Sequence, residues 1–465
     1  MNTPHTQDIL AAIADEVGAD QITVDADALA RHTDDWSGFP GETPKALARP
    51  RTVADVASIV RLCHEADQPL AVQGGRTGLA GGASTRRHEI ALSLDRLNGV
   101  EWVRDGAMQV FAGTSIASAQ DAAEAAGHSL GIDFGARGTA TIGGAIATNA
   151  GGLRVIETGM TRAQILGLEV VLADGRVLSE LTPMVKVNSG FDLKHLFVGS
   201  EGALGIITRA VLALSPLRAG LATAAIALHR ADDALPVLTA ARRAFGPDLA
   251  AFEAMWPDYV TTMSARTPFD FPLRAPLCLI IEVRAATDEG ARTRMEEFLE
   301  ESAHKGLVAD AVLAASLDQA RTLWALRDEG PAAYGTAFAA IVPFDVSVPS
   351  VHLHEAVAGL ARVAEAFPGT HPLTYGHIGD QNLHFVVGLD APDDGLKRAI
   401  EAGVYDVVAR LDGAVSAEHG IGQSKKAYLP LTRGPVALSL MRDLKHMFDP
   451  KGILNRGRVV DIADA

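Results

Sequence analysis

Short hydrophobic runs separated by glycine-rich turns dominate the first half of the chain. Runs with the apolar and β-branched content of strands lie at residues 69–73, 90–94 and 108–112. A helix is predicted after Thr52, a suitable N-cap, because apolar residues then recur every three or four positions up to Cys63. A second helix is predicted at 115–126, where Gly127 would end it. The alternation of these patterns indicates an α+β fold.

The segment 168–178 carries the clearest local pattern in this half. Two β-type runs flank Asp174-Gly175, a pair of residues that suits a tight primed turn. We therefore expect a β-hairpin here, within a first domain that ends near Ser215-Pro216.

Longer helical patterns mark the second half of the chain. They cover residues 231–246, 287–304, 316–328, 350–366 and 393–411, and the alanine-rich stretch 234–255 is also interpreted as helix. Apolar runs at 277–283, 341–348 and 385–388 lie between the helices. The pattern predicts a second α+β domain with a mainly antiparallel sheet and flanking helices.

Four segments follow from these patterns. They are a helical or irregular N-terminal segment at 1–45, a first domain at 46–216, a second domain at 217–440 and a C-terminal segment at 441–465. A chain of 465 residues is long enough for two or three domains.

The amino-acid composition makes some binding partners unfavourable for this protein. The 41 Lys and Arg residues against 57 Asp and Glu residues give a formal charge of −16, which repels nucleic acid and anionic membranes. Cys63 and Cys278 are too few for a disulfide framework. The N-terminus lacks the pattern of a signal peptide, and the sequence contains no uninterrupted run of 18 apolar residues. We expect a cytoplasmic protein without a membrane span.

Two glycine-rich runs carry the first chemical signal. Strand-like residues 70–72 lead into Gln73-Gly74-Gly75-Arg76-Thr77-Gly78, and residues 138–152 form a second run that adds hydroxyl groups and an amide. Glycine leaves backbone N–H groups bare and permits positive φ, so successive amides can point at a pyrophosphate. The sequence has no Gly-Lys pair, which excludes a P-loop, and neither run has the spacing of a Rossmann NAD site.

Three motifs together resemble one family. Residues 72–78, 142–152 and 196–208 are similar to the FAD domain of the vanillyl-alcohol oxidase and p-cresol methylhydroxylase superfamily. The likeness extends over nearly the whole chain to the D-2-hydroxyacid dehydrogenase branch, which includes D-lactate and D-2-hydroxyglutarate dehydrogenases. It implies an FAD-binding first domain, a substrate- and metal-binding second domain, and a C-terminal segment that returns to the flavin.

The resemblance also implies which residues contact FAD. They are Gln73, Gly74, Gly75, Arg76, Thr77, Gly78, Leu79, Gly82, Ala83, Gly138, Thr141, Ile142, Gly143, Gly144, Ala147, Asn149, Ala150, Gly152, Gly205, Ile206, Ile207 and Asn455. Many relatives attach FAD through a histidine in the first loop, where this chain has Arg76, Thr77 and Gly78. Noncovalent FAD is therefore predicted.

A cluster of histidine and glutamate residues carries the second signal. His377 and His384 are seven residues apart, so a bend at 379–382 is needed to aim both imidazoles at one ion. Glu418 and His419 follow about 34 residues later. Two histidines and a carboxylate suit a catalytic site for zinc or a similar divalent ion, although histidines in apolar strands are more often hydrogen-bonded core residues.

The resemblance assigns roles to these residues. It makes His377, His384 and Glu418 metal ligands, His419 the general base, and Arg327 the partner of the substrate carboxylate. An arginine that forms surface ion pairs on a helix is the alternative for Arg327. Asp380 and Asn382 are interpreted as turn residues or as supports of the metal ligands.

Three positions depart from the D-2-hydroxyglutarate dehydrogenase pattern. Pro331, Pro343 and Val386 stand where a threonine, a lysine and an asparagine are expected to hold the distal carboxylate. Because a desolvated second carboxylate would be poorly compensated, D-lactate or a more apolar D-2-hydroxyacid is favoured. Arg274 or Lys186 could restore recognition of a diacid, so D-2-hydroxyglutarate stays the alternative.

The sequence thus predicts an FAD-dependent, metal-assisted D-2-hydroxyacid dehydrogenase that passes electrons to a separate acceptor. An electron-transfer flavoprotein, a quinone and a cytochrome are all compatible acceptors, and a homodimer is compatible with the sequence. Two alternatives stay open: a flavin oxidase that uses oxygen, and a flavin- or metal-binding structural protein without turnover.

Overall fold

The structure is a computed structural model that describes residues 9–462 and divides into two compact units. Unit 1 comprises Met1–Gly152, Gly159–Leu217 and Glu418–Ala465, and unit 2 comprises Leu153–Thr158 and Arg218–Ala417. Residues 418–440, which the sequence pattern assigned to the second domain, lie in unit 1. The predicted terminal segments 1–45 and 441–465 also belong to unit 1, although 1–8 and 463–465 lie outside the described residues.

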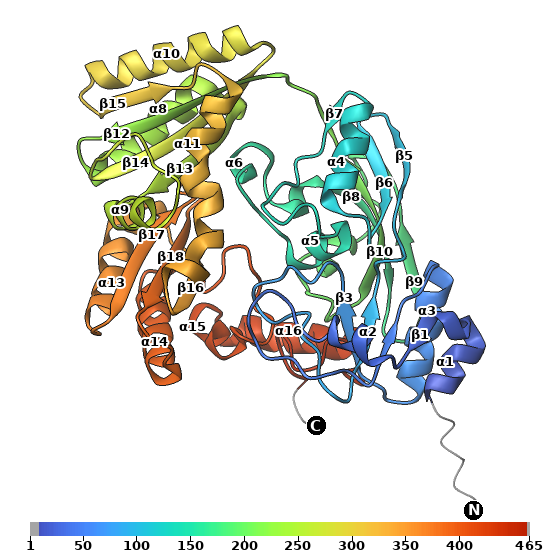
Figure 1. Cartoon of the computed structure of the whole chain (residues 1–465). Coiled ribbons are helices and arrows are strands. Elements are labelled where there is room, and N and C mark those ends of the chain that lie inside the picture. Colours follow the sequence, from blue (N-terminus) through green and yellow to red (C-terminus); the bar gives the residue numbers. More distant parts are fainter. Residues whose placement is uncertain (1–8, 463–465) are drawn as a thin grey trace, which may run out of the picture. The chain divides into compact units, whose positions relative to one another are not determined.

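Unit 1 is built on two main sheets (Figure 1). Over the described residues, one sheet has the order β1 (Ile22–Thr23), β2 (Ala46–Ala48), β4 (Ile90–Ser93) and β3 (Leu70–Gln73). The other is antiparallel, with the order β5 (Val100–Arg104), β6 (Ala107–Phe111), β10 (Ile206–Ala213), β8 (Ile165–Val171) and β9 (Val177–Glu180). A short pair joins β7 (His128–Ser129) to β11 (Ser215–Pro216).

Five helices of unit 1 contribute buried residues to a core shared by both sheets: α1 (Ile9–Val17), α3 (Val53–Glu65), α4 (Ile116–Ala125), α5 (Ile142–Thr148) and α7 (Lys194–Phe197). Helix α2 (Ala26–Ala30) packs in a small cluster with β2 and β4, and α15 (Leu429–Thr432) and α16 (Pro435–Phe448) contribute to another cluster near the C-terminal segment. Helix α3 begins where Thr52 and Asp55 form a capping box, and Ser115 caps α4, so the predicted starts of both helices are confirmed.

The predicted hairpin at 168–178 exists, but its turn differs from the prediction. Val171 pairs with Val177, and Leu172 N donates to Arg176 O, so a three-residue loop 173–175 joins β8 and β9. Gly175 has φ +86°, the left-handed position that such three-residue loops require. The Asp-Gly pair therefore supplies the end of a longer loop and not a two-residue turn.

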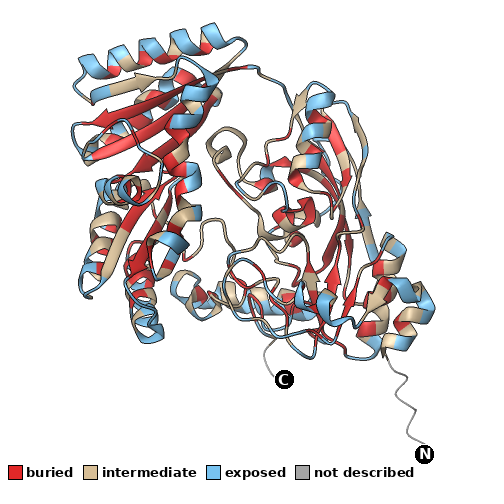
Figure 2. Cartoon of the chain, in the orientation of Figure 1, coloured by how far each residue is buried: buried red, intermediate tan, exposed pale blue. Residues whose placement is uncertain are grey.

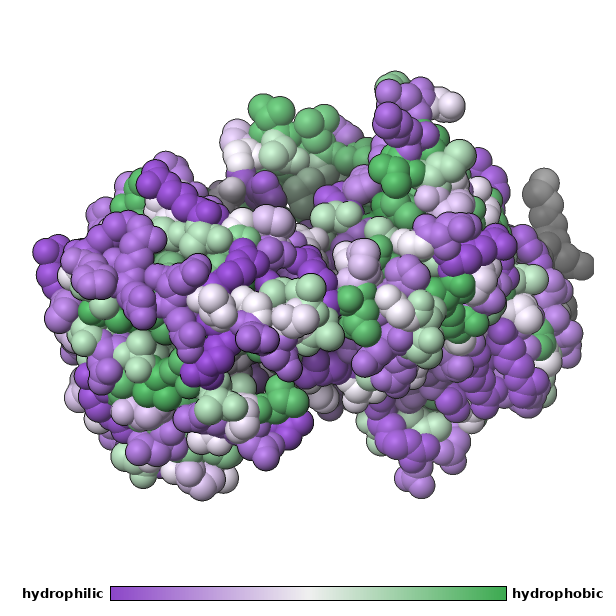
Figure 3. Space-filling model, turned by 90° about the horizontal axis from the view of Figure 1, so that it is seen from above, coloured by the Kyte–Doolittle hydropathy of each residue, from purple (hydrophilic) through white to green (hydrophobic). Residues whose placement is uncertain are grey.

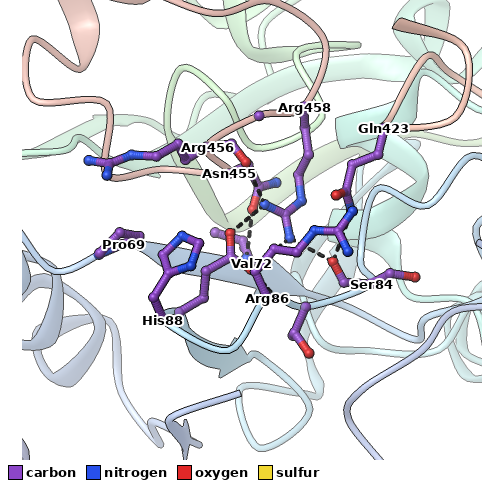
Figure 4. Close-up of polar contacts among 12 residues, drawn as sticks. Pro69, Val72, Ser84, Arg86, His88, Gln423, Asn455, Arg456 and Arg458 are labelled. Carbon is purple, nitrogen blue, oxygen red and sulfur yellow. Dashed lines mark hydrogen bonds and ion pairs between the residues drawn. The ribbon is translucent and has the colours of Figure 1, made fainter. Parts of the chain in front are cut away.

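The C-terminal segment of unit 1 lies beside β3 and the loop that follows it (Figure 4). Leu454 forms a parallel bridge with Leu70, and Leu70 N donates to Ile453 O at 2.8 Å. The Arg458 guanidinium is fully buried, pairs with the buried Glu89 carboxylate at 2.6 Å, and donates to Ser84 O at 2.7 Å. Residues 453–458 are thus anchored on β3 and on the loop that follows it.

Unit 2 contains a seven-stranded antiparallel sheet among its described residues, and its strands form the most deeply buried layer of this unit (Figure 2). The order is β15 (Val308–Leu313), β12 (Gly220–Leu228), β14 (Leu277–Ala285), β13 (Leu249–Met255), β17 (Thr370–Gly376), β18 (Asn382–Leu389) and β16 (Ala340–Ser347). This arrangement confirms the predicted α+β class and the mainly antiparallel sheet.

Helices cover the strands of unit 2 (Figure 1). Helices α9 (Pro257–Arg266), α11 (Leu317–Glu329) and α12 (Tyr334–Ala337) contribute to one core with the sheet, and α8 (Ala234–Phe245) packs with α10 (Asp288–His304) over β13 and β12. Helices α13 (Leu353–Glu365) and α14 (Asp394–Arg410) pack on β17 and β16, and the short α6 (Val155–Thr158) packs on β13.

The prediction of one helix over 234–255 is wrong in its second half. Helix α8 ends at Phe245, because Gly246 takes φ +57° and Pro247 follows it. Residues 249–255 form β13, which pairs with β14 and β17 and is buried along its whole length. A strand buried on both faces is nearly continuous in apolar residues, and periodicity alone does not distinguish such a run from a helix.

No helix of the described part of the chain is long and apolar enough to cross a membrane. On the face drawn in Figure 3, hydrophobic residues are interspersed among hydrophilic ones.

Replacing Arg458 with methionine should destabilise unit 1 strongly, because the Glu89 carboxylate would stay buried without its cation. We expect a loss of about 3–5 kcal/mol, whereas Arg51→Met, which breaks an exposed pair with Asp20, should cost at most about 1 kcal/mol. Urea unfolding followed by circular dichroism measures both. Equal losses for the two variants would contradict the structural role assigned to Arg458.

Candidate active site

The two glycine-rich runs lie against each other in unit 1. A Cβ atom on Gly74 would come within 2.4 Å of the Thr141 hydroxyl, and one on Gly75 within 2.1 Å of Thr139 O. Real Cβ atoms do not approach other atoms so closely, so only glycine lets the loop after β3 touch the second run. The resulting surface of bare main chain is the kind of cradle that a phosphate-bearing cofactor needs.

The second run is a loop followed by helix α5. Thr141 caps the helix by accepting from Gly144 N, and Asn149 ends it with φ +50°. Gly143 allows α5 to pack on β6, because a Cβ atom there would lie 2.6 Å from the Ala112 Cβ. The helix thus carries Ile142, Gly143, Gly144 and Ala147, while Gly138, Ala150 and Gly152 lie in the flanking loops.

Gln73 and Arg76, two of the predicted FAD residues, stabilise the first loop through side-chain contacts. Gln73 is fully buried and donates to His32 O and Ala83 O, both at 2.8 Å. Its carbonyl oxygen lies 2.8 Å from His32 Nδ1, and Arg76 Nη1 lies 3.1 Å from the same nitrogen. Because Arg76 has φ +56°, its backbone is held in the left-handed conformation. His32 was not identified from the sequence, since it lies far from any motif.

Asn455 spans two loops. Its carboxamide accepts from Val72 N at 2.8 Å and donates to Glu201 O at 2.6 Å (Figure 4). The described contacts of its side chain are therefore with the main chain of β3, just before the first glycine-rich loop, and of the loop before β10. The remaining predicted residues of unit 1 lie in the first loop (Thr77, Gly78, Leu79, Gly82 and Ala83) or at the start of β10 (Gly205, Ile206 and Ile207).

Two imidazoles meet on one face of unit 2. Strands β17 and β18 form a hairpin in which Tyr375 pairs with His384, and Asn382 N donates to His377 O at 3.2 Å. The ring centroids of His377 and His384 are consequently 5.0 Å apart. The bend expected at 379–382 is thus a hairpin connection in which Gln381 has φ +74°, and Asn382 already belongs to β18.

A buried carboxylate lies behind His377. Glu253 on β13 accepts from His377 Nδ1 at 2.5 Å and from Arg327 Nε at 2.9 Å. Arg327 Nη2 lies 3.2 Å from His377 Nε2, and its guanidinium lies 4.6 Å from the Tyr375 ring centroid. Burial would raise the pKa of Glu253, but the charges and hydrogen bonds of His377 and Arg327 outweigh burial and lower it.

Arg327 is therefore a buried residue, and not the surface ion-pairing arginine that the sequence left open. Sequence reasoning missed Glu253, because it lies in the stretch interpreted as helix. An isolated acid within the apolar run 249–255 was the one signal that could have identified it. A carboxylate on one imidazole nitrogen is a common support for a metal-binding histidine.

The segment before Glu418 is attached to β16. Ala414 and Ser347 form a bridge, and Ala417 N donates to the Asp345 carboxylate at 3.2 Å. Asp345 is in turn the cross-strand partner of His384. Unit 2 ends at Ala417, and Glu418 and His419 follow directly as the first residues of the last segment of unit 1.

Two of the three departures from the diacid pattern are neighbours. Pro343 on β16 and Val386 on β18 are cross-strand partners, two residues along from the pair Asp345 and His384. They consequently lie on the sheet face that carries His384. Arg274, by contrast, is half-exposed and bonded to Asp270 and nearby carbonyls of its own loop, and Lys186 is exposed in unit 1.

Comparison with known proteins identifies the family. Residues 44–179 match the model of an FAD binding domain, and residues 219–459 match the C-terminal domain of FAD linked oxidases. The chain is 37% identical over 454 residues to a mitochondrial D-2-hydroxyglutarate dehydrogenase of Bos taurus, covering 97% of this chain and 83% of that protein. It is 32% identical to the D-2-hydroxyglutarate dehydrogenase of Stutzerimonas stutzeri, covering 94% and 96%.

The fold of solved structures agrees with this relationship. A p-cresol methylhydroxylase with substrate bound superposes with a TM-score of 0.80 at 16% identity, over 98% of this chain and 97% of that chain. An alkyldihydroxyacetonephosphate synthase gives 0.75 at 18% identity, over 98% and 86%. The chain belongs to the FAD-linked oxidase family, as an FAD-dependent D-2-hydroxyacid dehydrogenase, and the predicted fold and use of FAD are confirmed.

Replacing Gly75 with alanine should abolish the cofactor cradle. The new Cβ atom would collide with Thr139 O, and backbone on both sides must move apart. We expect purified Gly75→Ala to retain less than about a tenth of the wild-type FAD. The lost main-chain contacts would then weaken FAD binding by at least about 1.4 kcal/mol, the free energy of a tenfold change in affinity. Gly135→Ala, where the added Cβ meets open space, is the control. Flavin absorbance per protein measures the outcome, and normal flavin content in Gly75→Ala would contradict the cradle.

Proposed function

We propose that this dehydrogenase oxidises a D-2-hydroxyacid to the 2-oxoacid with the help of a divalent metal ion. His377, His384 and Glu418 would hold the ion, with zinc as the first candidate, and His419 would accept the proton of the substrate hydroxyl. The observation that carries the proposal is the pair of imidazoles on one face of the β17–β18 hairpin, backed by Glu253.

The donor set supports a metal. His377, His384 and Glu418 each offer a ligand atom of a type that binds zinc. Glu253 accepts from His377 Nδ1, so the other ring nitrogen is the one proposed to bind the ion. The buried Asn382 carboxamide, on the same hairpin, has no hydrogen-bond partner among the described residues, as expected of a group next to a ligand site.

The chemistry divides between bound groups and side chains. A bound divalent ion would make the substrate hydroxyl more acidic, and bound FAD would supply the hydride acceptor for the carbon that carries this hydroxyl. Arg327 Nε donates to Glu253, so the proposal assigns the two terminal nitrogens of the guanidinium to the substrate carboxylate. Arg327 Nη2, which lies 3.2 Å from His377 Nε2, would then leave that ring nitrogen to the ion. The fixed charge of Arg327 would orient the substrate, and His419 would take the proton.

The substrate preference follows from the sheet face beside His384. Pro343 and Val386 supply no hydrogen bond or charge for a second carboxylate, and Val386 belongs to the same apolar cluster as Tyr375. D-lactate or a more apolar D-2-hydroxyacid therefore stays the favoured substrate. The names of the relatives above favour the alternative, D-2-hydroxyglutarate.

Several finer points complete the proposal. FAD is noncovalent, because Arg76, Thr77 and Gly78 replace the histidine that attaches it in relatives. Electrons pass to a separate acceptor, with an oxygen-using oxidase as the alternative that peroxide release would reveal. The expected cytoplasmic location and the homodimer stay predictions, and the bovine relative is named as mitochondrial.

Removing the metal or one of its proposed ligands should stop reduction of the flavin by substrate. Mixing the protein anaerobically with D-2-hydroxyacids should bleach the FAD absorbance band, and a chelator or His384→Ala should slow bleaching at least about 100-fold, since an unassisted hydroxyl is a poor acid. His354→Ala, at an exposed histidine, is the control. Full bleaching rates in metal-free protein would remove the metal from the proposal.

Lysine at position 343 should shift the preference toward diacids. The wild type is expected to favour D-lactate or a longer apolar D-2-hydroxyacid over D-2-hydroxyglutarate in kcat/KM by about tenfold or more. Pro343→Lys should reduce this ratio, because the new ammonium would lie across from Val386 on the face that carries His384. Val351→Lys adds the same charge at an exposed site elsewhere in unit 2. A wild type that prefers the diacid would overturn the assignment.

A further inference from the structure

We propose that Glu201 is a positioning residue whose carboxylate holds the segment that carries His419. The proposal rests on the role of His419 in the proposed function. Glu201 precedes Gly202 in the loop that leads into β10, so it lies in unit 1 together with His419.

The contacts are specific and paired. Ile421 N donates to Glu201 Oε1 at 2.7 Å, and Gly422 N donates to Glu201 Oε2 at 2.8 Å. A Cβ atom on Gly420 would lie 2.9 Å from the Glu201 carboxyl carbon, so the main chain rests directly on the carboxylate. Burial raises the pKa of Glu201, and the two backbone hydrogen bonds oppose that rise. Two successive amides are therefore the main described partners of a desolvated carboxylate.

The same segment is fastened to the first glycine-rich loop. Gln423 N and Ser424 N donate to Ala80 O at 3.0 and 3.1 Å, and the Gln423 side chain donates to Gly81 O. The same side chain also donates to Ser84 O (Figure 4). Gly422 O accepts from Val459 N at 2.9 Å, and a Cβ atom on Gly422 would lie 2.1 Å from Ala80 O. The segment therefore has little freedom to shift against the FAD cradle.

Chain connectivity explains why this matters for His419. The amide of Ala417 donates to Asp345 in unit 2, and the amide of Ile421 donates to Glu201 in unit 1. Glu418, His419 and Gly420 lie between these two residues in the chain. Since consecutive Cα atoms are about 3.8 Å apart, the Cα atom of His419 lies within about 8 Å of that of Ile421. A displacement of Ile421 is consequently passed to the proposed base.

The backbone at Glu201 indicates that its side chain is needed. Its φ is +52°, a left-handed conformation that is unfavourable for a residue with a Cβ atom. Glycine would fit this position better, and only the side chain gives glutamate an advantage there.

Two variants test the proposal in the full-length, FAD-loaded protein. Glu201→Gln keeps the shape but turns one acceptor into a donor, and Glu201→Gly removes the side chain while relieving the backbone. Both should slow anaerobic reduction of bound flavin by about 10- to 100-fold, the size expected of a misplaced catalytic group, with the substrate Kd changed less than about threefold. Glu169→Gln, at a buried carboxylate of the β8–β10 pair, is the control and should reduce at the wild-type rate.

A second measurement does not depend on catalysis. Hydrogen exchange of the peptide covering 418–424 should become at least about tenfold faster in Glu201→Gln than in the wild type or Glu169→Gln, because its amides lose an acceptor. Unchanged exchange in this peptide would overturn the positioning role. Faster exchange with an unchanged reduction rate per bound flavin would overturn the link to His419. If no D-2-hydroxyacid reduces the bound flavin of the wild type, the proposed function is refuted. The exchange result would then test by itself whether Glu201 holds the segment 418–424.

Discussion

The register of the β17–β18 hairpin is the constraint on which the proposed chemistry depends. Because Tyr375 pairs with His384, His377 and His384 come to the same face. The next strand over, β16, then brings Asp345 opposite His384 and Pro343 opposite Val386. A shift of β18 by one residue would move His384 to the other face and separate it from His377, which the pairing of β17 with β13 keeps beside Glu253. The two imidazoles proposed as metal ligands and the apolar face beside His384 thus depend on the same strand register.

The FAD cradle could be predicted from the sequence because its requirement is local. Successive glycines after a strand predict that other atoms pack closely against the main chain at that point. Gly74 and Gly75 confirm this, because both contact the second glycine-rich run. The contacts that brace the cradle could not be predicted in this way. His32, Glu89 and Arg458 lie far apart in the sequence, and only the tertiary fold brings them to the first loop.

The site in unit 2 could be predicted from the sequence only in part. The histidines and their need for a bend were evident, but Glu253 was hidden in an apolar stretch that fits a helix as well as a buried strand. The alanine content of residues 249–255 favours a helix by intrinsic propensity. These residues form a strand because they pair with β14 and β17 in the sheet. The same strand pairing turns an unremarkable acid into the partner of both His377 and Arg327.

X-ray absorption spectroscopy of the zinc-loaded protein is the sharpest test of the proposed metal site. We expect one tightly bound zinc ion, coordinated by two imidazole nitrogens at about 2.0–2.1 Å and by a carboxylate oxygen. In His384→Ala the imidazole scattering should fall to that of one ring. A protein that binds no zinc, or a shell without imidazole, would contradict the account.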